Sequence, residues 1–300
     1  MSPDNPQWIL LAVLPQAILT GLIALVSARY LCRLAPRPTS AAVTLIITAA
    51  FTTSFLILFG LPNLPPKVER DHLLITILPA ATAIALLGTF FKLPLLLWPA
   101  RLALAIAVPL LAVWGSPFLN PESSRAWDTA GQLLYLALPA ALIFIPRILT
   151  AFRTQTDTPR HRAAVLATTA LATGLLGLFS EAAGVGQLAI ALTGILTAVA
   201  VASLLIRSTK RQLQLEDLTL PLLALLTLSA LHFAGLQPRH ALTLALAYTA
   251  WTAIPLIPVL NNHPLTTLLT RWTALLALLA WPVTEAAITF ITEYDDTYTN

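Results

Sequence analysis

The apolar positions of this 300-residue chain fall into runs of about 20 residues, separated by short segments rich in charged residues and proline. An α-helix rises about 1.5 Å per residue, so about 20 apolar residues cross a hydrocarbon core of about 30 Å. The pattern therefore predicts ten membrane-spanning helices. Their approximate ranges are 8–31, 40–60, 72–91, 94–115, 127–149, 163–181, 187–206, 218–236, 240–260 and 272–291.

The composition agrees with this pattern, since 57% of the residues are hydrophobic, only 10% are charged and the mean hydropathy is +0.81. Soluble domains carry about 25% charged residues. The runs also lack the alternation typical of barrel strands. We therefore expect an all-α, polytopic integral membrane bundle, with residues 1–300 as one membrane domain and the lipid bilayer as its surroundings. The net charge of +4 is spread over several short loops, so we expect no nucleic-acid partner.

The distribution of Lys and Arg predicts the orientation of the bundle. With both termini outside a cell inner membrane, 13 of the 17 basic residues fall on the cytoplasmic side and only Lys67, Arg70, Arg125 and Arg239 face outward. This bias agrees with the positive-inside rule. Ten of the 13 acidic residues fall outside, and the exceptions are Asp157, Glu216 and Asp217. The inward basic residues are Arg29, Arg33, Arg37, Lys92, Arg101, Arg147, Arg153, Arg160, Arg162, Arg207, Lys210, Arg211 and Arg271.

Arg101 interrupts the apolar stretch "LLLWPARLALAIAVPLLAVW" (95–114), and it has two interpretations. If the helix enters the hydrocarbon only at Leu102, the remaining run is still long enough to cross, and Arg101 extends into the inner headgroups as an interfacial anchor. If the span begins at Leu93, Arg101 lies about two turns deep and faces a partner or a cavity. We expect the anchor.

Three further ionisable residues within or beside the spans are candidate functional residues, because such groups are costly in a bilayer. Glu285 follows Pro282 in the last span and could exchange a proton, or it could be an outer-edge glutamate bonded to a neighbour. His232 lies near the outer end of the eighth span, and Glu181 begins the turn after the sixth. No ligand spacing indicates a metal site, and we expect no cofactor.

Glycine and proline indicate local geometry within the spans. Gly174, Gly177, Gly184 and Gly186 in "GLLGLFSEAAGVG" predict a close approach of the sixth and seventh helices across a tight turn. Prolines inside spans, such as Pro79 and Pro139, predict kinks that the surrounding bundle tolerates.

Two resemblances accompany these patterns. The chain resembles ten-span drug/metabolite-type carriers in length and span count, without a shared motif. The stretch "GLPNLPPKVERDHLLITILPA" (60–80) is similar to a Leu-Pro-x-x-Pro-Pro loop of bacterial multi-spanning proteins of unknown function. The second resemblance implies no activity.

The function that these observations favour is that of a non-catalytic structural or scaffolding bundle with membrane-protein partners, because interior charges are few. The first alternative is a small-solute carrier, with or without proton coupling, for which Glu285, His232 and Arg101 would supply the polar groups. The second is a membrane enzyme that acts on lipid. We expect no enzyme, because the chain contains no nucleotide-binding glycine loop, no GxSxG, no HExxH and no CxxC.

Overall fold

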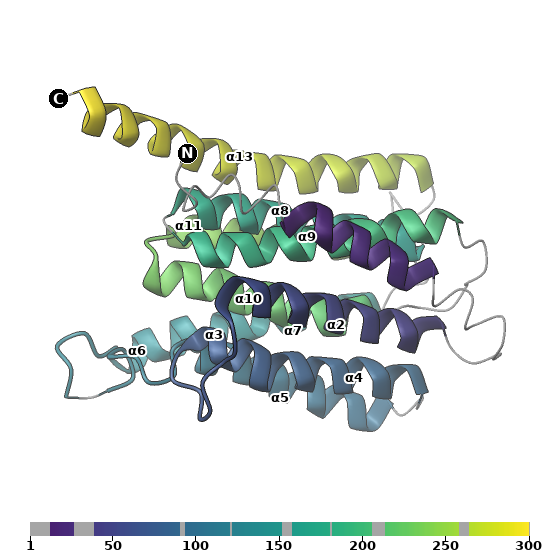
Figure 1. The fold of residues 1–300 in the computed structure, drawn as a ribbon, viewed down its shortest axis with the longest axis horizontal. Coiled ribbons are helices and arrows are strands. Elements are labelled where there is room, and N and C mark those ends of the chain that lie inside the picture. The colour runs from purple at the N-terminus through teal and green to yellow at the C-terminus, as the bar shows by residue number, and fades with distance from the viewer. Residues whose placement is uncertain are drawn as a thin grey trace.

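The computed structural model describes residues 13–26, 39–90, 94–120, 122–151, 158–180, 182–205, 214–257 and 264–299. Within these ranges the chain is helical and contains no strand. The long helices lie roughly side by side along one direction (Figure 1). This arrangement confirms the all-helical class that the apolar runs predict.

The helices follow the predicted runs closely. A first helix spans Val13–Val26. The others are α2 (Thr39–Phe59), α3 (Glu69–His72) with η1 (Leu73–Ile77) and α4 (Leu78–Phe90), α5 (Pro94–Ala112), α6 (Thr129–Gln132) with η2 (Leu133–Ala137) and α7 (Leu138–Ala151), α8 (Pro159–Phe179), α9 (Ala183–Leu205), α10 (Leu215–Phe233), α11 (Pro238–Ala253) with η3 (Ile254–Leu256), and α13 (Pro264–Thr299).

Each of the ten predicted ranges overlaps one of these helical segments, but only seven segments in the described ranges are long and apolar enough to cross a membrane. The helix Val13–Val26 and the apolar part of α5, Leu97–Ala112, are shorter than that length. The helix α11 has 16 residues. The seven long apolar helices are compatible with a membrane protein, whereas the count of ten spans stays a prediction.

Two of the long helices change their winding just before a proline. The π-helical segments η1 and η2 end one residue before the Leu-Pro pairs 78–79 and 138–139. Proline has no N–H and its ring crowds the carbonyl four residues earlier, so a wider turn relieves that clash. The two segments share a sequence pattern, "LLITILPAA" at 73–81 and "LLYLALPAA" at 133–141. The helices accommodate Pro79 and Pro139, as predicted for prolines inside spans, and they do so by π-helical winding just before each proline.

The glycine-rich stretch between α8 and α9 permits the closest approach of two helices. A Cβ atom added to Gly186 would lie 2.8 Å from the Gly174 carbonyl oxygen, and one added to Gly177 would lie 3.0 Å from the Gly186 backbone. Backbone atoms cannot move aside as flexible side chains do. The predicted tight hairpin of the sixth and seventh helices is confirmed.

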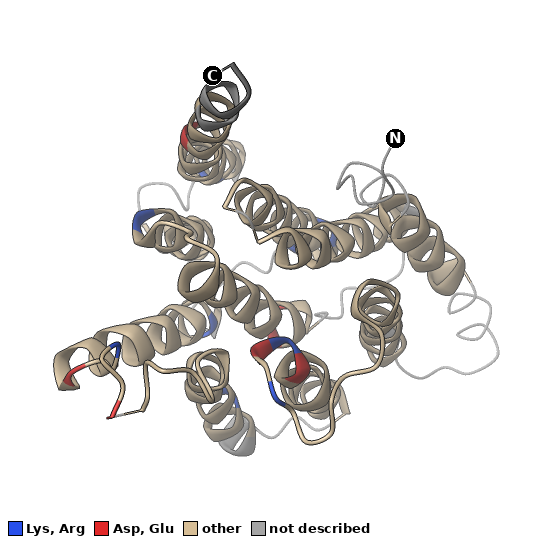
Figure 2. Cartoon of the chain, turned by 60° about the vertical axis from the view of Figure 1, so that its left-hand side comes forward, with Lys and Arg blue, Asp and Glu red and all other residues tan. Residues whose placement is uncertain are grey.

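The hairpin α8–α9 and the helix α10 form the interior of the bundle, whereas α13 and the α6–η2–α7 helix expose most of their apolar surface. Large exposed side chains on α13 include Leu265, Leu269 and Ile288. Most of the helical surface carries no charged residue (Figure 2). An apolar exterior of this kind suits contact with hydrocarbon and does not suit water.

Two opposite ends of the bundle carry different residues. We call one the arginine end, defined by Arg101, Arg147, Arg162 and Arg271, where α8, α10 and α13 begin. We call the other the aromatic end, defined by Phe118, Trp127, Tyr135 and His232, where α8 and α10 terminate and α11 begins.

Candidate functional site

Arg101 is paired inside the bundle. Its Nε and Nη2 atoms each donate a hydrogen bond to Asp217, to Oδ1 and Oδ2 respectively, both at 2.8 Å. The Arg101 side chain is 14% exposed and that of Asp217 only 1%. The expectation that Arg101 is an interfacial anchor is therefore wrong, and the alternative of a buried partner is correct. Two parallel bonds to one carboxylate satisfy the guanidinium of Arg101 within the bundle.

The same carboxylate belongs to a larger network of buried charges. Arg147 pairs with Asp217 and lies 3.3 Å from Glu216, and Arg162 lies 3.3 Å from the other oxygen of Glu216. The amide oxygen of Gln214 accepts from both Arg101 and Arg147, at 3.5 and 3.4 Å. We call Arg101, Arg147, Arg162, Glu216 and Asp217 the ion-pair network.

Local sequence explains why the two carboxylates lie at this position. Glu216 and Asp217 occupy the first turn of α10, where the partial positive charge of a helix N-terminus stabilises carboxylates. Their arginine partners come from α5, α7 and α8, at the same end of the bundle. The network thus connects four helices at the arginine end.

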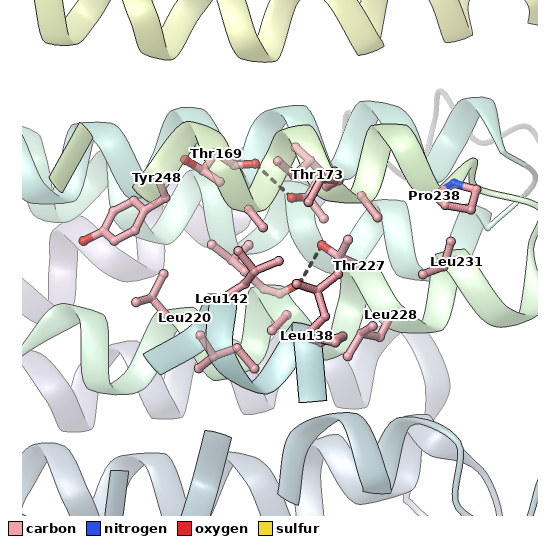
Figure 3. Close-up of a pocket in the computed structure, with 18 of the residues that line it drawn as sticks. Leu138, Leu142, Thr169, Thr173, Leu220, Thr227, Leu228, Leu231, Pro238 and Tyr248 are labelled. Carbon is pink, nitrogen blue, oxygen red and sulfur yellow. Dashed lines mark hydrogen bonds between the residues drawn. The ribbon is translucent and has the colours of Figure 1, made fainter. Parts of the chain in front are cut away.

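A cavity of about 460 Å³ lies between the α6–η2–α7 helix and the helices α8, α10 and α11. Binding pockets for small molecules typically measure about 300–1,000 Å³. Lining residues extend along α10 from Leu220 to Leu231, which is about 16 Å at 1.5 Å per residue. In Figure 3 Tyr248 and Leu220 lie toward one end of the lining, and Pro238 and Leu231 toward the other.

Most of the lining is leucine, alanine and proline, and the polar side chains are few. Thr169 and Thr173 come from α8, Thr227 from α10, Tyr135 and Tyr248 lie toward opposite ends, and Arg239 is the charged residue of the lining. Over the described ranges of the chain, the lining includes no Ser, Cys, His, Asp or Glu. The cavity suits a small, mainly apolar ligand.

The ion-pair network borders the arginine end of this cavity. Ile143 and Leu220 line both the cavity and a much smaller space of about 20 Å³ among Arg101, Arg147, Glu216 and Asp217. The inner lining residues therefore pack directly against the charged side chains. Because the network joins α5, α7, α8 and α10, it holds the helices around the cavity together at this end.

His232, a predicted candidate, lies among aromatic rings at the aromatic end. The rings of Phe118, Trp127 and Tyr135 form a stack, with centroids 5.0 and 4.8 Å apart, and the His232 ring contacts all three at 5.1–5.9 Å. Phe118 and Trp127 belong to the loop between α5 and α6, and Tyr135 lines the cavity. His232 thus helps to hold this loop beside the cavity.

Glu285, another predicted candidate, also borders the cavity, through Arg239. Glu285 pairs with Arg239 and lies 3.4 Å from Nε2 of His240, which joins α13 to α11. The Arg239 side chain is 54% exposed and that of Glu285 28%. The glutamate is bonded to neighbours at the edge of the bundle, as one of its two interpretations proposed.

Glu181 lies outside the described residues. Among the residues that the structure describes, no three His, Cys, Asp or Glu side chains gather in a way that could hold a metal ion. Three of the four predicted candidates are therefore placed, and they lie at two different ends: Arg101 in the network, and His232 and Glu285 near the aromatic end.

Sequence reasoning assigned no functional role to Arg147, Arg162, Glu216 and Asp217. It treated the arginines as determinants of orientation and the two acids as exceptions to the outward bias. The position of Glu216 and Asp217 on the basic side of the bundle was the signal that could have indicated the network. Two carboxylates on that side have arginine partners within reach. The cavity threonines carried no signal, because threonine occurs in nine of the ten predicted spans.

Comparisons with known proteins identify no relative: no family model, no curated protein and no solved structure matches this chain.

Proposed function

We propose that the chain is a multi-pass protein of a bacterial-type inner membrane with both termini outside, and that it carries a small, mainly apolar solute. In this orientation the arginine end faces the cytoplasm and the aromatic end faces outward. The asymmetric distribution of Lys and Arg supports the orientation. The seven long apolar helices support the membrane.

The cavity is the observation that carries the proposal. It is lined by four helical segments, the α6–η2–α7 helix, α8, α10 and α11, and it occupies their middle and outer parts. Carriers bind solutes near the middle of the membrane, where helices are interrupted. The π-helical segment η2 is a local change of winding in one lining helix, and its residues Leu134 and Tyr135 line the cavity toward the aromatic end.

The ion-pair network supplies the closed cytoplasmic end that a carrier needs. Charged side chains that are paired across four helices can separate when the helices move and can pair again when they return. In the proposed orientation this layer lies between a solute in the cavity and the cytoplasm.

The cavity favours a carrier over the structural bundle that composition alone favoured, because a scaffold needs no ligand-binding cavity. It also favours a carrier over a lipid enzyme. In the part of the lining that the structure describes, no nucleophile lies next to a base, which the common hydrolytic mechanisms require.

Cysteine accessibility tests the proposal directly. In a Cys32→Ser background, Thr227→Cys places one thiol in the cavity, and Thr193→Cys places one in α9 away from it. A membrane-impermeant maleimide is then added to right-side-out and inside-out vesicles. A carrier that alternates should expose residue 227 to reagent from both sides, while residue 193 stays unlabelled. Labelling of residue 227 from one side or from neither would overturn the proposal.

A further inference from the structure

We propose that the solute bound in the cavity carries a hydrogen-bond donor, a hydroxyl or an N–H, near the middle of an otherwise apolar body. This inference rests on the proposed function and specifies the class of solute. It follows from the direction of the hydrogen bonds that the lining residues already make.

The hydroxyl groups of the three lining threonines already donate hydrogen bonds to backbone carbonyls of their own helices. Thr169 donates to the Val165 carbonyl at 3.0 Å and Thr173 to the Thr169 carbonyl at 3.0 Å. Thr227 donates to the Leu223 carbonyl at 2.8 Å. Dashed lines in Figure 3 mark the bonds of Thr173 and Thr227. A hydroxyl whose proton is used keeps two lone pairs, so each of these oxygens offers an acceptor to a ligand.

Two backbone carbonyls of the lining helix also lack the donor that an α-helix provides. Pro139 follows Tyr135 by four residues, and Pro146 follows Leu142 by four residues, and all four residues line the cavity. Proline has no N–H, so neither carbonyl receives the usual bond from four residues on. The acceptors that the hydrogen bonds of the lining establish are the threonine oxygens.

Donors lie toward the ends of the cavity. Arg239, at the aromatic end, already donates to Gln237 and Glu285. The hydroxyls of Tyr135 and Tyr248 belong to residues near opposite ends. The middle of the cavity is therefore rich in acceptors and poor in donors.

This imbalance selects among solutes. A ligand hydroxyl or N–H in the middle of the cavity can bond to a threonine oxygen. A ligand carbonyl, ether or carboxylate there meets only other acceptors and loses its hydration without replacement, which costs affinity. Sites built for a particular hydrogen-bonding group reject analogues that lack it more strongly than apolar pockets reject a change in size.

Indole and 1-methylindole test the inference as a matched pair of probes. Indole has one N–H donor, whereas 1-methylindole is larger and more apolar and has none. The purified protein in lipid nanodiscs is titrated with each probe, and affinity is obtained from the rise in Tm, since binding to the folded state stabilises it. We expect indole to bind about fivefold more tightly, the effect of one net hydrogen bond.

Two variants test whether the preference for indole over 1-methylindole arises at the threonines. Thr173→Val and Thr227→Val keep the side-chain shape but remove the acceptor, so each should reduce the preference for indole. Thr168→Val is the matched control, because Thr168 makes the same kind of bond, to the Ala164 carbonyl, but does not line the cavity. It should leave the preference unchanged.

The outcomes separate this inference from the proposed function. A cavity-filling variant, Ala224→Phe, should abolish binding of both probes, while Ala277→Phe on the exposed face of α13 should not. Equal or tighter binding of 1-methylindole that Ala224→Phe abolishes would overturn the donor requirement and leave the cavity as a binding site. A preference for indole that persists in both valine variants would also overturn it. Failure of both probes to bind the unmutated protein would count against the carrier itself.

Discussion

Arg101 of α5 and Asp217 of α10 are separated by 116 positions in the sequence, and they form a two-bonded ion pair with both N–O distances at 2.8 Å. The pair links a proline-containing helix of the periphery to a helix of the interior. Its geometry requires the planar guanidinium, because Nε and Nη2 are spaced to match the two oxygens of one carboxylate.

Substitution Arg101→Lys should therefore destabilise the protein. Lysine keeps the charge but offers no planar pair of donors, so one charge-assisted hydrogen bond is lost, at a cost of about 1.5–3 kcal/mol. The measurement is the unfolding free energy in detergent micelles. Arg125→Lys, on the exposed loop before α6, should be neutral. If both substitutions were equally mild, Arg101 would act as an anchor after all.

Substitution Asp217→Asn should be more harmful than Arg101→Lys. Asp217 compensates both Arg101 and Arg147, so its neutralisation leaves Arg101 with no carboxylate partner among the described residues and leaves Arg147 with Glu216, which Arg162 also contacts. Removal of one partner of a buried ion pair typically costs about 3–5 kcal/mol.

The control for Asp217→Asn is Asp128→Asn. Asp128 caps α6 by accepting from the Gly131 N–H, and asparagine is an equally good cap. Expression level and thermal unfolding in the same detergent would compare the two variants. A melting temperature that changes equally in both would show that the network contributes little to stability.

Substitution Gly186→Ala should separate α8 from α9. The added methyl group would meet the Gly174 carbonyl at 2.8 Å and the Leu178 backbone nitrogen at 2.9 Å, and neither can move alone. Overpacking of this kind costs about 1–3 kcal/mol. At Gly88 in α4 the nearest atom, 3.4 Å away, belongs to the flexible side chain of Gln214. Gly88→Ala should be neutral or stabilising because alanine favours a helix, and thermal unfolding of both variants would check this contrast.

Local patterns were sufficient to predict the helices and the α8–α9 hairpin. A run of about 20 apolar residues has few alternatives to a helix once backbone groups must be satisfied within the segment. The glycines of 174–186 predicted close contact because only glycine permits backbone to approach backbone. The π-helical winding at η1 and η2 was not predicted, although similar nine-residue stretches, 73–81 and 133–141, contain both segments.

The site could not be predicted to the same extent, because it depends on packing between distant segments. The partner of Arg101 is determined by how α5 and α10 cross, and nothing near Arg101 in the sequence indicates Asp217. The cavity is a place where side chains of four helical segments fail to meet. Its threonines resemble those of α2 and α9, which make the same bonds to their own helices and line no cavity of this size.

Substitution Glu285→Gln tests whether transport is coupled to protons. Glu285 pairs with Arg239, and Arg239 lines the cavity. Binding of a proton to Glu285 would remove the negative charge beside Arg239, and this contact is a direct route from a proton to the bound solute. Glutamine keeps the shape of the protonated acid but exchanges no proton.

The expected result has two parts, which separate coupling from folding. An ion pair this exposed contributes at most about 1 kcal/mol, so thermal unfolding of Glu285→Gln should be nearly unchanged. In proteoliposomes that hold the protein, uptake of labelled indole should no longer be accelerated by a proton gradient, while exchange without a gradient persists. Glu122→Gln on the exposed loop should keep the acceleration. Acceleration that survives in Glu285→Gln would exclude Glu285 as the coupling residue and leave the cavity and its donor preference intact.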